Sequence, residues 1–423
     1  MAKMRFSLLV LFLFSFGFFS RTVHSDDTFK PIKVLEAKLN VKTPEEPKFS
    51  IFVISTEMIL GKAKPILDRA PNGLYLTVGS ERGFRGIAMT PNATHLILLD
   101  VSPAIIRFNR INRELLRSPS LEEYKNLRWN LPFDSWKKIS QNLNLDDFKW
   151  WEENVRNFES FSYPIPELIN RFGKDIFLDR FIKISEHLRQ LRHQLLEKGT
   201  SVSEESLFFK SSYEDWTSYL KKAELNNITL TQQDWTWWKK FVGTKEKPAY
   251  AYHWIEEPTN AIDIGSIIDY KTGNYLFDPS LYKKLHTMAI QGRIATFLLD
   301  LSDPKQAQVL ANAIRETKLK LSVLDLDNTY FETYIGQKPY YHLVKSMLDL
   351  GNPNSVLLAM FNYKNFSASQ FQTYVGFSFA NVKSWPADFL MQDFFMALPK
   401  DSLDLINGRF YQAGEMPPLP HPK

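Results

Sequence analysis

The sequence predicts an α/β protein with a mostly parallel sheet flanked by helices and a large inserted helical subdomain. Apolar runs of strand length occur at 74–78, 94–99, 294–299, 321–326 and 355–361, and segments of helical period separate most of them. Strands that alternate with helices are typical of a parallel sheet covered on both faces. A further observation is size, because 423 residues with 44% hydrophobic side chains suffice for a large core.

Residues 1–25 have the pattern of a secretory signal peptide. Lys3 and Arg5 precede an apolar run at 6–19, and Val23 and Ser25 supply small residues before a cleavage site. The run is shorter than the roughly 20 residues that span a bilayer, so we expect cleavage after Ser25 and no stable membrane span afterwards. The chain is therefore predicted to be exported, to the periplasm or out of the cell.

The composition excludes several classes of site. The absence of cysteine excludes a disulfide framework, a thiolate metal site and a cysteine nucleophile. The 8 histidines form no His-Glu-x-x-His motif, and we expect no bound metal. The net charge of +5 includes Lys3, Arg5 and Arg21 of the signal peptide. No basic cluster remains that would predict a nucleic-acid partner.

Residues 26–71 are predicted to be an N-terminal extension. Its first part, 26–49, contains several prolines and lysines, which favour an extended chain. A short strand is expected at 51–55 and a helix near 57–68.

Residues 72–117 are predicted to form the first half of the α/β core. We expect a strand at 74–78, a short helix reaching Met89, a strand at 94–99, and a helix that starts at Pro103. Asn109 and Asn112 share one face of this last helix. A polar helix surface is the preferred interpretation for them, and approach to a ligand is the alternative.

The remaining chain divides into an insertion and the second half of the core. Residues 118–285 are rich in tryptophan and mostly helical in period, so they are predicted to be the inserted helical subdomain. Its tryptophans are interpreted as core residues, and as its contact with the main domain, rather than as a ligand-stacking site. Residues 286–423 are predicted to complete the core and form the tail, with candidate late strands at 394–398 and 409–412.

Polar residues follow the strand ends, where an open α/β sheet binds its ligand. Gly79 and Gly83 follow the first core strand, and glycine permits positive φ and close approach of a ligand. Asp100 ends the next strand, about 20 residues on, where an acidic side chain can accept hydrogen bonds from ribose hydroxyls. A tight turn with a helix-capping aspartate is the alternative interpretation. Asp300 and Asp325 end two later strands, so these ends form one acidic crest if the strands are neighbours.

Two stretches, TVGSERGF at 77–84 and LILLDVSPAIIRFNRINRELL at 96–116, carry a resemblance to a known family. They resemble the first two strands of class I S-adenosylmethionine-dependent methyltransferases, and are especially similar to an uncharacterised bacterial group of exported methyltransferase-like proteins. The resemblance covers 72–117 best and 290–400 more loosely. It implies S-adenosylmethionine as cofactor, with Asp100 holding the ribose and Val101 or Ser102 near the adenine. The residues it implies around the methionine part of the cofactor are Gly79, Ser80, Glu81 and Gly83.

The same resemblance implies an acceptor site after the strand at 321–326, which corresponds to the family's fourth strand. The residues in that place are Asp325, Asp327, Asn328 and Tyr330. Methyl transfer needs positioning more than acid/base power, so an oxygen there would hold the nucleophile and an aromatic face would favour the sulfonium charge. A weaker similarity links the chain to the aminocarboxypropyl transferases that build betaine lipids, which use the same cofactor.

Two other functions remain open. Asp325-x-Asp327-x-Thr329 resembles the signature of haloacid dehalogenase-like phosphatases, with Asp325 as nucleophile and Asp327 as acid/base, but no paired-aspartate strand end for Mg²⁺ follows it. Alternatively, the fold serves as a non-catalytic binding or structural module, because the cofactor is made in the cytoplasm and the chain is predicted to leave it. We expect a group transferase with an unknown acceptor, and keep both alternatives.

Overall fold

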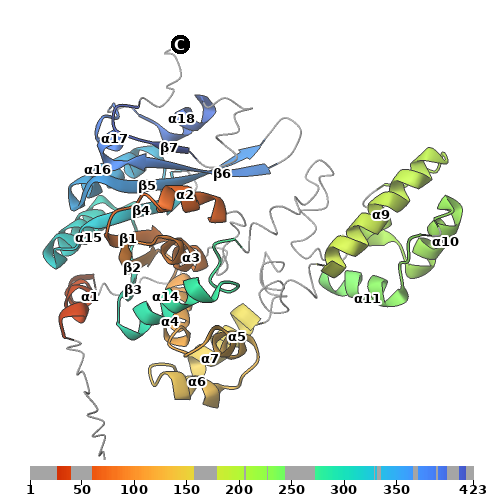
Figure 1. Ribbon diagram of the computed structural model, residues 1–423, viewed down its shortest axis with the longest axis horizontal. Helices are drawn as coiled ribbons and strands as arrows, with labels where there is room; N and C mark the ends of the chain where they lie inside the picture. The colour runs from red at the N-terminus through yellow and green to blue at the C-terminus, as the bar shows by residue number, and fades with distance from the viewer. Residues whose placement is uncertain are drawn as a thin grey trace, which may run out of the picture.

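The core of the protein is a seven-stranded sheet with the order β3-β2-β1-β4-β5-β6-β7, covered by helices on both faces (Figure 1). The strands are β1 (Gly73–Val78), β2 (Ala93–Asp100), β3 (Ile294–Leu298), β4 (Leu321–Asp327), β5 (Gly351–Lys364), β6 (Gln370–Ser378) and β7 (Arg409–Tyr411). The computed structural model describes residues 26–39, 60–156, 179–203, 206–225, 227–242, 272–327, 329–330, 335–364, 370–386, 389–397 and 409–415.

Strands β1 to β5 run parallel, and β6 is antiparallel to β5. β7 pairs in parallel with β6. The predicted α/β class with a mostly parallel sheet is therefore confirmed. The sequence did not predict β6, whose signal is weakened by Gly376, because a glycine inside a strand lowers its propensity. A Cβ atom built at Gly376 would clash with Ile66, so the glycine is required where the N-terminal region packs on β6.

The two faces of the sheet bury alternate side chains of each strand. Tyr75, Leu96 and Leu98 belong to one apolar cluster, and Leu74 and Ile97 belong to the other. This alternation follows from the two-residue period of a strand. The first face is covered by α3 (Glu81–Met89), α4 (Pro103–Leu115) and α14 (Pro279–Ile290), and the second by α1 (Asp26–Leu39), α15 (Pro304–Thr317) and α16 (Gln337–Met347).

The N-terminal extension begins with a helix, so the predicted extended chain is wrong for the described part of 26–49. Ile32, Leu35 and Leu39 of α1 lie at helical spacing and are buried in the cluster shared with α15. Burial of each side chain contributes roughly 1.5–3 kcal/mol. Together they outweigh the roughly 3 kcal/mol cost of a proline inside a helix, here Pro31.

Two further predictions concern the segment before β1. The helix expected near 57–68 is present in the described residues as η1 (Leu60–Ala63) and α2 (Lys64–Leu67). The strand expected at 51–55 and the signal peptide at 1–25 lie outside the described residues.

All secondary structure described between β2 and β3 is helical. Figure 1 shows α9, α10 and α11 beside one another. In chain order after α4, the elements are α5 (Leu121–Trp129), α6 (Phe133–Ile139), α7 (Leu145–Trp151), η2 (Glu152–Arg156), α9 (Asp179–Glu197), η5 (Ser206–Lys210), α10 (Tyr213–Ala223), α11 (Gln232–Phe241) and α14.

Four tryptophans of these helices are buried in the apolar core. Trp136, Trp151, Trp216 and Trp238 are fully buried, and each indole N–H donates to a backbone carbonyl at 2.8 or 2.9 Å. A buried indole with its N–H satisfied is a stable core residue. The interpretation of these four tryptophans as core residues is confirmed.

One of the two candidate late strands is wrong. The candidate strand at 394–398 is wrong, because α18 (Met391–Ala397) is a helix. Phe394 and Phe395 of α18 are buried against Phe377 of β6 and Tyr330, so packing on the sheet decides its structure. The candidate strand at 409–412 is confirmed as β7. Within the described ranges, no helix combines the length and the apolar character needed to cross a membrane.

Candidate functional site

The carboxyl ends of four neighbouring strands bring the predicted polar residues to one edge of the sheet. Asp300 follows β3, Asp100 ends β2, Gly79 follows β1, and Asp325 and Asp327 lie at the end of β4. These strands are neighbours, which was the condition for a single acidic crest. The strand order reverses between β1 and β4, and such a switch point is where open α/β sheets bind their ligands.

The β1–α3 turn, residues 79–81, leaves free space at the end of β1. Gly79 has a φ of +90°, which favours glycine, and a Cβ atom built there meets no described atom within 4 Å. Its amide donates to the Leu99 carbonyl of β2 at 3.0 Å. Val78 and Leu99 are paired in the sheet, so the residues that follow them, Gly79 and Asp100, lie side by side.

Asp100 is a half-buried carboxylate next to this turn. One of its oxygens accepts a hydrogen bond from the Ser102 amide at 2.8 Å. Burial raises the pKa of Asp100 from 3.8 to about 6, against the lowering effect of the backbone amides of Ser102, Val101 and Gly79. Asp100 therefore combines acceptor oxygens with a charge that changes just below neutral pH.

The two residues after Asp100 lead into the next helix, which starts at Pro103. Val101 is 37% exposed. Ser102 occupies the N-cap position of α4, but its side chain makes no capping hydrogen bond. Both are therefore placed at the rim of the strand ends, beside Asp100.

Gly83 lies in the contact between α3 and the sheet. A Cβ atom built there would lie 2.6 Å from Thr77 Cγ2 and would clash with Leu98. One turn later, a Cβ at Gly86 would lie 2.7 Å from Tyr75 Cζ. The two glycines allow α3 to approach β1 and β2 closely, so the structure places Gly83 at a helix–sheet packing contact.

Asp325 and Asp327 share one arginine. Arg82, in the first turn of α3, donates from Nη2 to Asp325 Oδ1 at 2.6 Å and from Nε to Oδ2 at 3.3 Å. Its Nη1 pairs with Asp327. The Tyr75 hydroxyl donates to Asp325 Oδ2 at 2.7 Å. Both oxygens of Asp325 are therefore engaged by residues of β1 and α3.

This cluster is buried and carries more negative than positive charge. Asp325 is fully buried, and the Arg82 side chain is 4% exposed. Burial raises the pKa of Asp325, Arg82 lowers it, and the charge of Asp327 raises it further. One cation faces two carboxylates. Because Asp325 is buried and both of its oxygens accept hydrogen bonds, the cluster holds β4 against β1 and α3 and does not expose Asp325.

The other residues predicted at the end of β4 lie in different surroundings. The Asp327 side chain is 17% exposed, and its φ of +54° is rare for a residue other than glycine. Tyr330 is buried in the core, where its hydroxyl donates to the Met360 carbonyl at 3.1 Å. Asn328 lies outside the described residues. Its partial exposure makes Asp327 the reachable candidate of the set, and backbone conformations of this kind cluster at functional sites.

A second buried network holds the β1–α3 turn from the helical side. The Glu81 side chain is 1% exposed, and its Oε1 pairs with Arg128 Nη2 at 3.3 Å and accepts from the Tyr275 hydroxyl at 3.2 Å. The side-chain Nδ2 of Asn109 donates to the Gly79 carbonyl at 2.9 Å. Asn109 and Asn112 are both fully buried, so the prediction of a polar helix surface is wrong for them.

Four residues of the site escaped the sequence interpretation. They are Tyr75, Arg128, Tyr275 and Tyr340, and none of them belongs to a motif that the sequence shows. The Tyr340 hydroxyl is buried without a hydrogen-bond partner among the described residues, and the charges of Asp325 and Asp327 add to the burial that raises its pKa. For Tyr75, a hydroxyl inside an apolar run is the only local signal, and it does not identify the distant partner.

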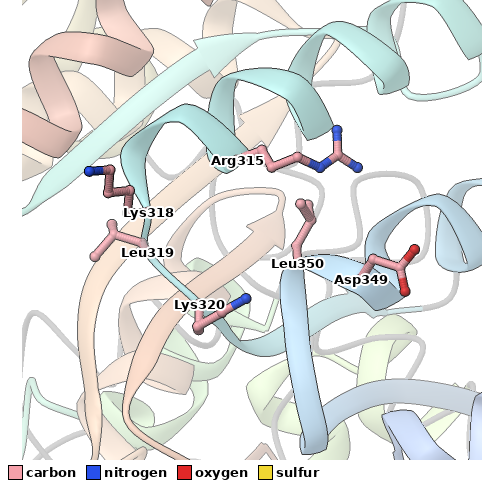
Figure 2. Close-up of a pocket in the computed structure, with 6 residues that line it drawn as sticks. All are labelled: Arg315, Lys318, Leu319, Lys320, Asp349 and Leu350. Carbon is pink, nitrogen blue, oxygen red and sulfur yellow. The ribbon is translucent and has the colours of Figure 1, made fainter.

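A cavity of about 250 Å³ lies at the opposite edge of the sheet, where β4 and β5 begin (Figure 2). Its basic side chains sit at the C-terminal end of α15, where cations interact favourably with the helix dipole. This accounts for them without a ligand. The lining residues are Arg315, Lys318, Leu319, Lys320, Asp349 and Leu350.

Among the described residues, no three histidine, aspartate or glutamate side chains come together as metal ligands. No protein-family model matches the chain, and no curated protein matches it in sequence. The function therefore has to be argued from the strand ends and the two buried networks around them.

Proposed function

We propose that this protein binds S-adenosylmethionine at the carboxyl ends of β1 and β2 and transfers a group from it to an unknown acceptor. The observation that carries the proposal is the position of Asp100 beside Gly79, at the point where the strand order reverses. A carboxylate there can accept hydrogen bonds from both ribose hydroxyls, and the free space at Gly79 admits a ligand close to the backbone.

The strand order supports the proposal without being specific for it. The order β3-β2-β1-β4-β5 is shared by nucleotide-binding α/β folds, which host many activities. We propose a methyltransferase-like variant of this fold, with Ser80 and Glu81 beside the methionine part of the cofactor and Val101 or Ser102 beside the adenine. The helices between 118 and 285 would form the inserted subdomain that selects the acceptor.

The acceptor end is proposed at Asp327. It is the partly exposed carboxylate of the pair, and Arg82 holds it in place. Asp325 would then act through Arg82, because its own oxygens are occupied. This division also weakens support for the phosphatase alternative, in which Asp325 would have to reach a phosphorus atom.

The second candidate function is a binding module that holds the cofactor without transferring a group. The burial of Asp325 and the pairing of both β4 carboxylates with Arg82 favour it. The proposed export of the chain also favours it, because the cofactor is made in the cytoplasm. The two candidates share one ligand site and differ only in turnover.

Thermal unfolding with S-adenosylmethionine and S-adenosylhomocysteine tests the ligand site. Binding to the folded state alone raises stability by about 2.7 kcal/mol when the ligand is at one hundred times its Kd. We expect a rise in melting temperature that the Asp100→Ala variant loses. No rise at millimolar ligand would contradict the proposal.

Asp300→Ala is the matched control. Asp300 ends the neighbouring strand in the same Asp-x-Ser turn, and its Oδ1 accepts from the Ser302 amide at 2.9 Å. It should keep the ligand-induced rise, because it lies on the outer side of β2 from the β1–α3 turn. Release of S-adenosylhomocysteine with candidate acceptors then separates the transferase from the binding module. Hydrolysis of an aryl phosphate with Mg²⁺, abolished by Asp325→Asn, would favour the phosphatase instead.

A further inference from the structure

The guanidinium of Arg128 lies at the centre of a buried network between three helices. Arg128 is fully buried, and it comes from α5, in the helical stretch between β2 and β3. Its Nη2 faces Glu81 Oε1 at 3.3 Å, and its Nη1 donates to the Tyr124 hydroxyl at 3.0 Å. Asn112 of α4 accepts from the same Tyr124 hydroxyl at 2.5 Å. The network therefore ties α5 to α4 and to the first residue of α3.

Aromatic rings enclose this guanidinium. Its central carbon lies 5.6 Å from the ring centre of Phe108, 5.2 Å from Trp129 and 5.5 Å from Trp151. Cations stack favourably on aromatic faces, and a planar guanidinium does so in a fixed orientation. The direction in which Arg128 presents its nitrogens to Glu81 is therefore set by α4, α5 and α7.

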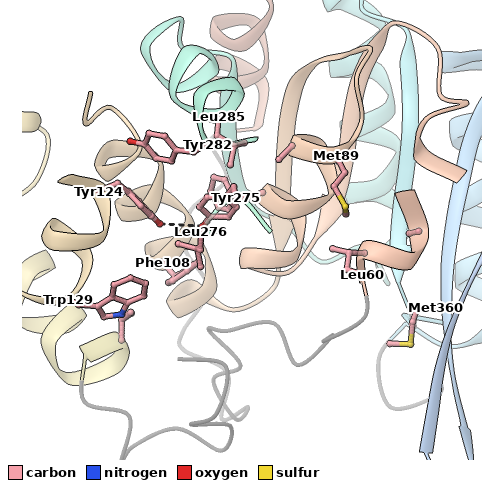
Figure 3. Close-up of a cluster of buried hydrophobic side chains, with 14 of the residues drawn as sticks. Leu60, Met89, Phe108, Tyr124, Trp129, Tyr275, Leu276, Tyr282, Leu285 and Met360 are labelled. Carbon is pink, nitrogen blue, oxygen red and sulfur yellow. Dashed lines mark hydrogen bonds between the residues drawn. The ribbon is translucent and has the colours of Figure 1, made fainter. Parts of the chain in front are cut away.

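Tyr275 completes the surroundings of Glu81. Its hydroxyl donates to Glu81 Oε1 at 3.2 Å. The same hydroxyl lies 3.3 Å from the Tyr124 hydroxyl (Figure 3). Burial raises the pKa of both tyrosines, so they remain neutral hydrogen-bond donors. Among the described residues, Glu81 Oε2 has no hydrogen-bond partner. Arg128 and Tyr275 thus hold the Glu81 carboxylate through one oxygen, from a single side.

We infer that Arg128 is a positioning residue for the β1–α3 turn, acting through Glu81. Glu81 is the last residue of the turn and the first of α3, so its side chain sets the conformation of Gly79 and Ser80 beside Asp100. This inference rests on the proposed function for its effect on ligand affinity. Its effect on the turn itself does not depend on any ligand. The helical stretch between β2 and β3 would therefore build part of the cofactor site as well as selecting an acceptor.

Hydrogen exchange of the ligand-free protein tests the inference directly. In Arg128→Met, we expect amide exchange at residues 79–83 to become at least tenfold faster, with little change in α15 and β4. Arg156→Met is the matched control, because Arg156 also holds α5, through the carbonyls of Leu127 and Arg128, and not through Glu81. Equal acceleration at 79–83 in both variants would overturn the inference, because it would reflect general loosening of α5.

A neutral double variant separates positioning from stability. Removing one partner of a buried ion pair leaves an uncompensated charge, whereas removing both is often nearly neutral for stability. Arg128→Met with Glu81→Gln should therefore restore most of the melting temperature that Arg128→Met loses. If Arg128 positions the turn, exchange at 79–83 stays fast in the double variant although the melting temperature is restored.

The double variant can also contradict the inference. A double variant that regains both the melting temperature and slow exchange at 79–83 would show a structural role alone, and would overturn the inference. A wild-type protein that binds no S-adenosylhomocysteine would contradict the proposed function instead. The exchange measurement decides the inference in that case, because it uses no ligand.

Discussion

Arg82 Nη2 lies 2.6 Å from Asp325 Oδ1, inside the protein, although the two residues are 243 positions apart in the sequence. Asp325 lies on β4 and Arg82 on the helix that follows β1, so their pair bridges the two strands between which the strand order reverses. Asp325 and Asp327, the nucleophile and acid/base of the phosphatase interpretation, therefore both pair with an arginine from the proposed cofactor side of the site.

Arg82→Met should destabilise the protein by about 3–5 kcal/mol, because it leaves buried carboxylates without their cation. The pKa of Asp325 is already raised in the folded state and rises further without Arg82. A protonated Asp325 no longer needs the cation, so the loss should be larger at pH 8 than at pH 5. Urea unfolding at both pH values measures it.

Lys38→Met is the control for this variant. Lys38 pairs with Glu316 at 3.2 Å, but both side chains are about half exposed. Exposed pairs contribute about 0–1 kcal/mol, so the change should be small at either pH. An Arg82→Met loss as small as this would show that the buried cluster is not held by its charge.

Asp100→Asn should stabilise the ligand-free protein at high pH. The folded-state pKa of Asp100 is about 6 and its ordinary value is 3.8, so ionisation of this residue costs stability as pH rises through 6. Asparagine avoids that cost, which predicts a gain of about 1–3 kcal/mol at pH 8 and none at pH 4. Thermal unfolding across this range checks it, and a gain that grows toward low pH would contradict the assignment.

The pH dependence of ligand binding follows from the same residue. Asp100 accepts ribose hydrogen bonds best as a carboxylate, so affinity for S-adenosylhomocysteine should fall below pH 6 and level off above it. Calorimetric titration at several pH values measures this. Asp100→Asn should bind more weakly at pH 8 and lose this dependence. An unchanged pH profile in the variant would point to another titrating group.

Gly79 in the β1–α3 turn and Gly86 inside α3 should respond differently to substitution by alanine. Gly86→Ala places a Cβ atom against the Tyr75 ring and should cost about 1–3 kcal/mol of stability. Gly79→Ala meets free space and costs about 1–2 kcal/mol for its left-handed conformation, but it fills the volume proposed for the cofactor. Of the two variants, Gly79→Ala should show the larger loss of affinity for S-adenosylhomocysteine. The reverse order would place the ligand elsewhere.

Leu35→Ala tests the helix at the N-terminus. Leu35 is fully buried against the second face of the sheet, so its truncation should cost about 2–5 kcal/mol. Lys33→Ala, on the exposed side of the same helix, should change stability by less than about 0.5 kcal/mol. Equal and small effects of both variants in urea unfolding would show that α1 is not docked.

Strands β1 to β5 and the position of Asp100 could be predicted because their signals are local. An apolar run that ends in aspartate identifies a buried strand and its carboxyl end wherever its partners lie. The helix at 26–39 was missed because Pro31 and the lysines outweighed three apolar residues at helical spacing, whose value appears only when α15 is beside them. In that segment, tertiary packing determines the secondary structure and overrides the local propensity.

The buried networks could not be predicted, because their partners are far apart in sequence. Nothing near Arg82 in the sequence identifies Asp325 as its partner. Asn109 and Asn112 read as surface residues, because isolated asparagines usually are exposed. Their burial depends on Gly79, Tyr124 and Tyr275.

The sequence separation between β1 and its neighbour β4 also delays the pairing of these two strands during synthesis. Tyr75 and Asp325 are 250 residues apart. A ribosome that adds about 5–20 residues per second needs roughly 12 to 50 seconds to make that stretch. During this interval the central strand can pair with β2 but has one edge open. Such an edge is a site for aggregation, so we expect the growing chain to depend on a chaperone until β4 is made.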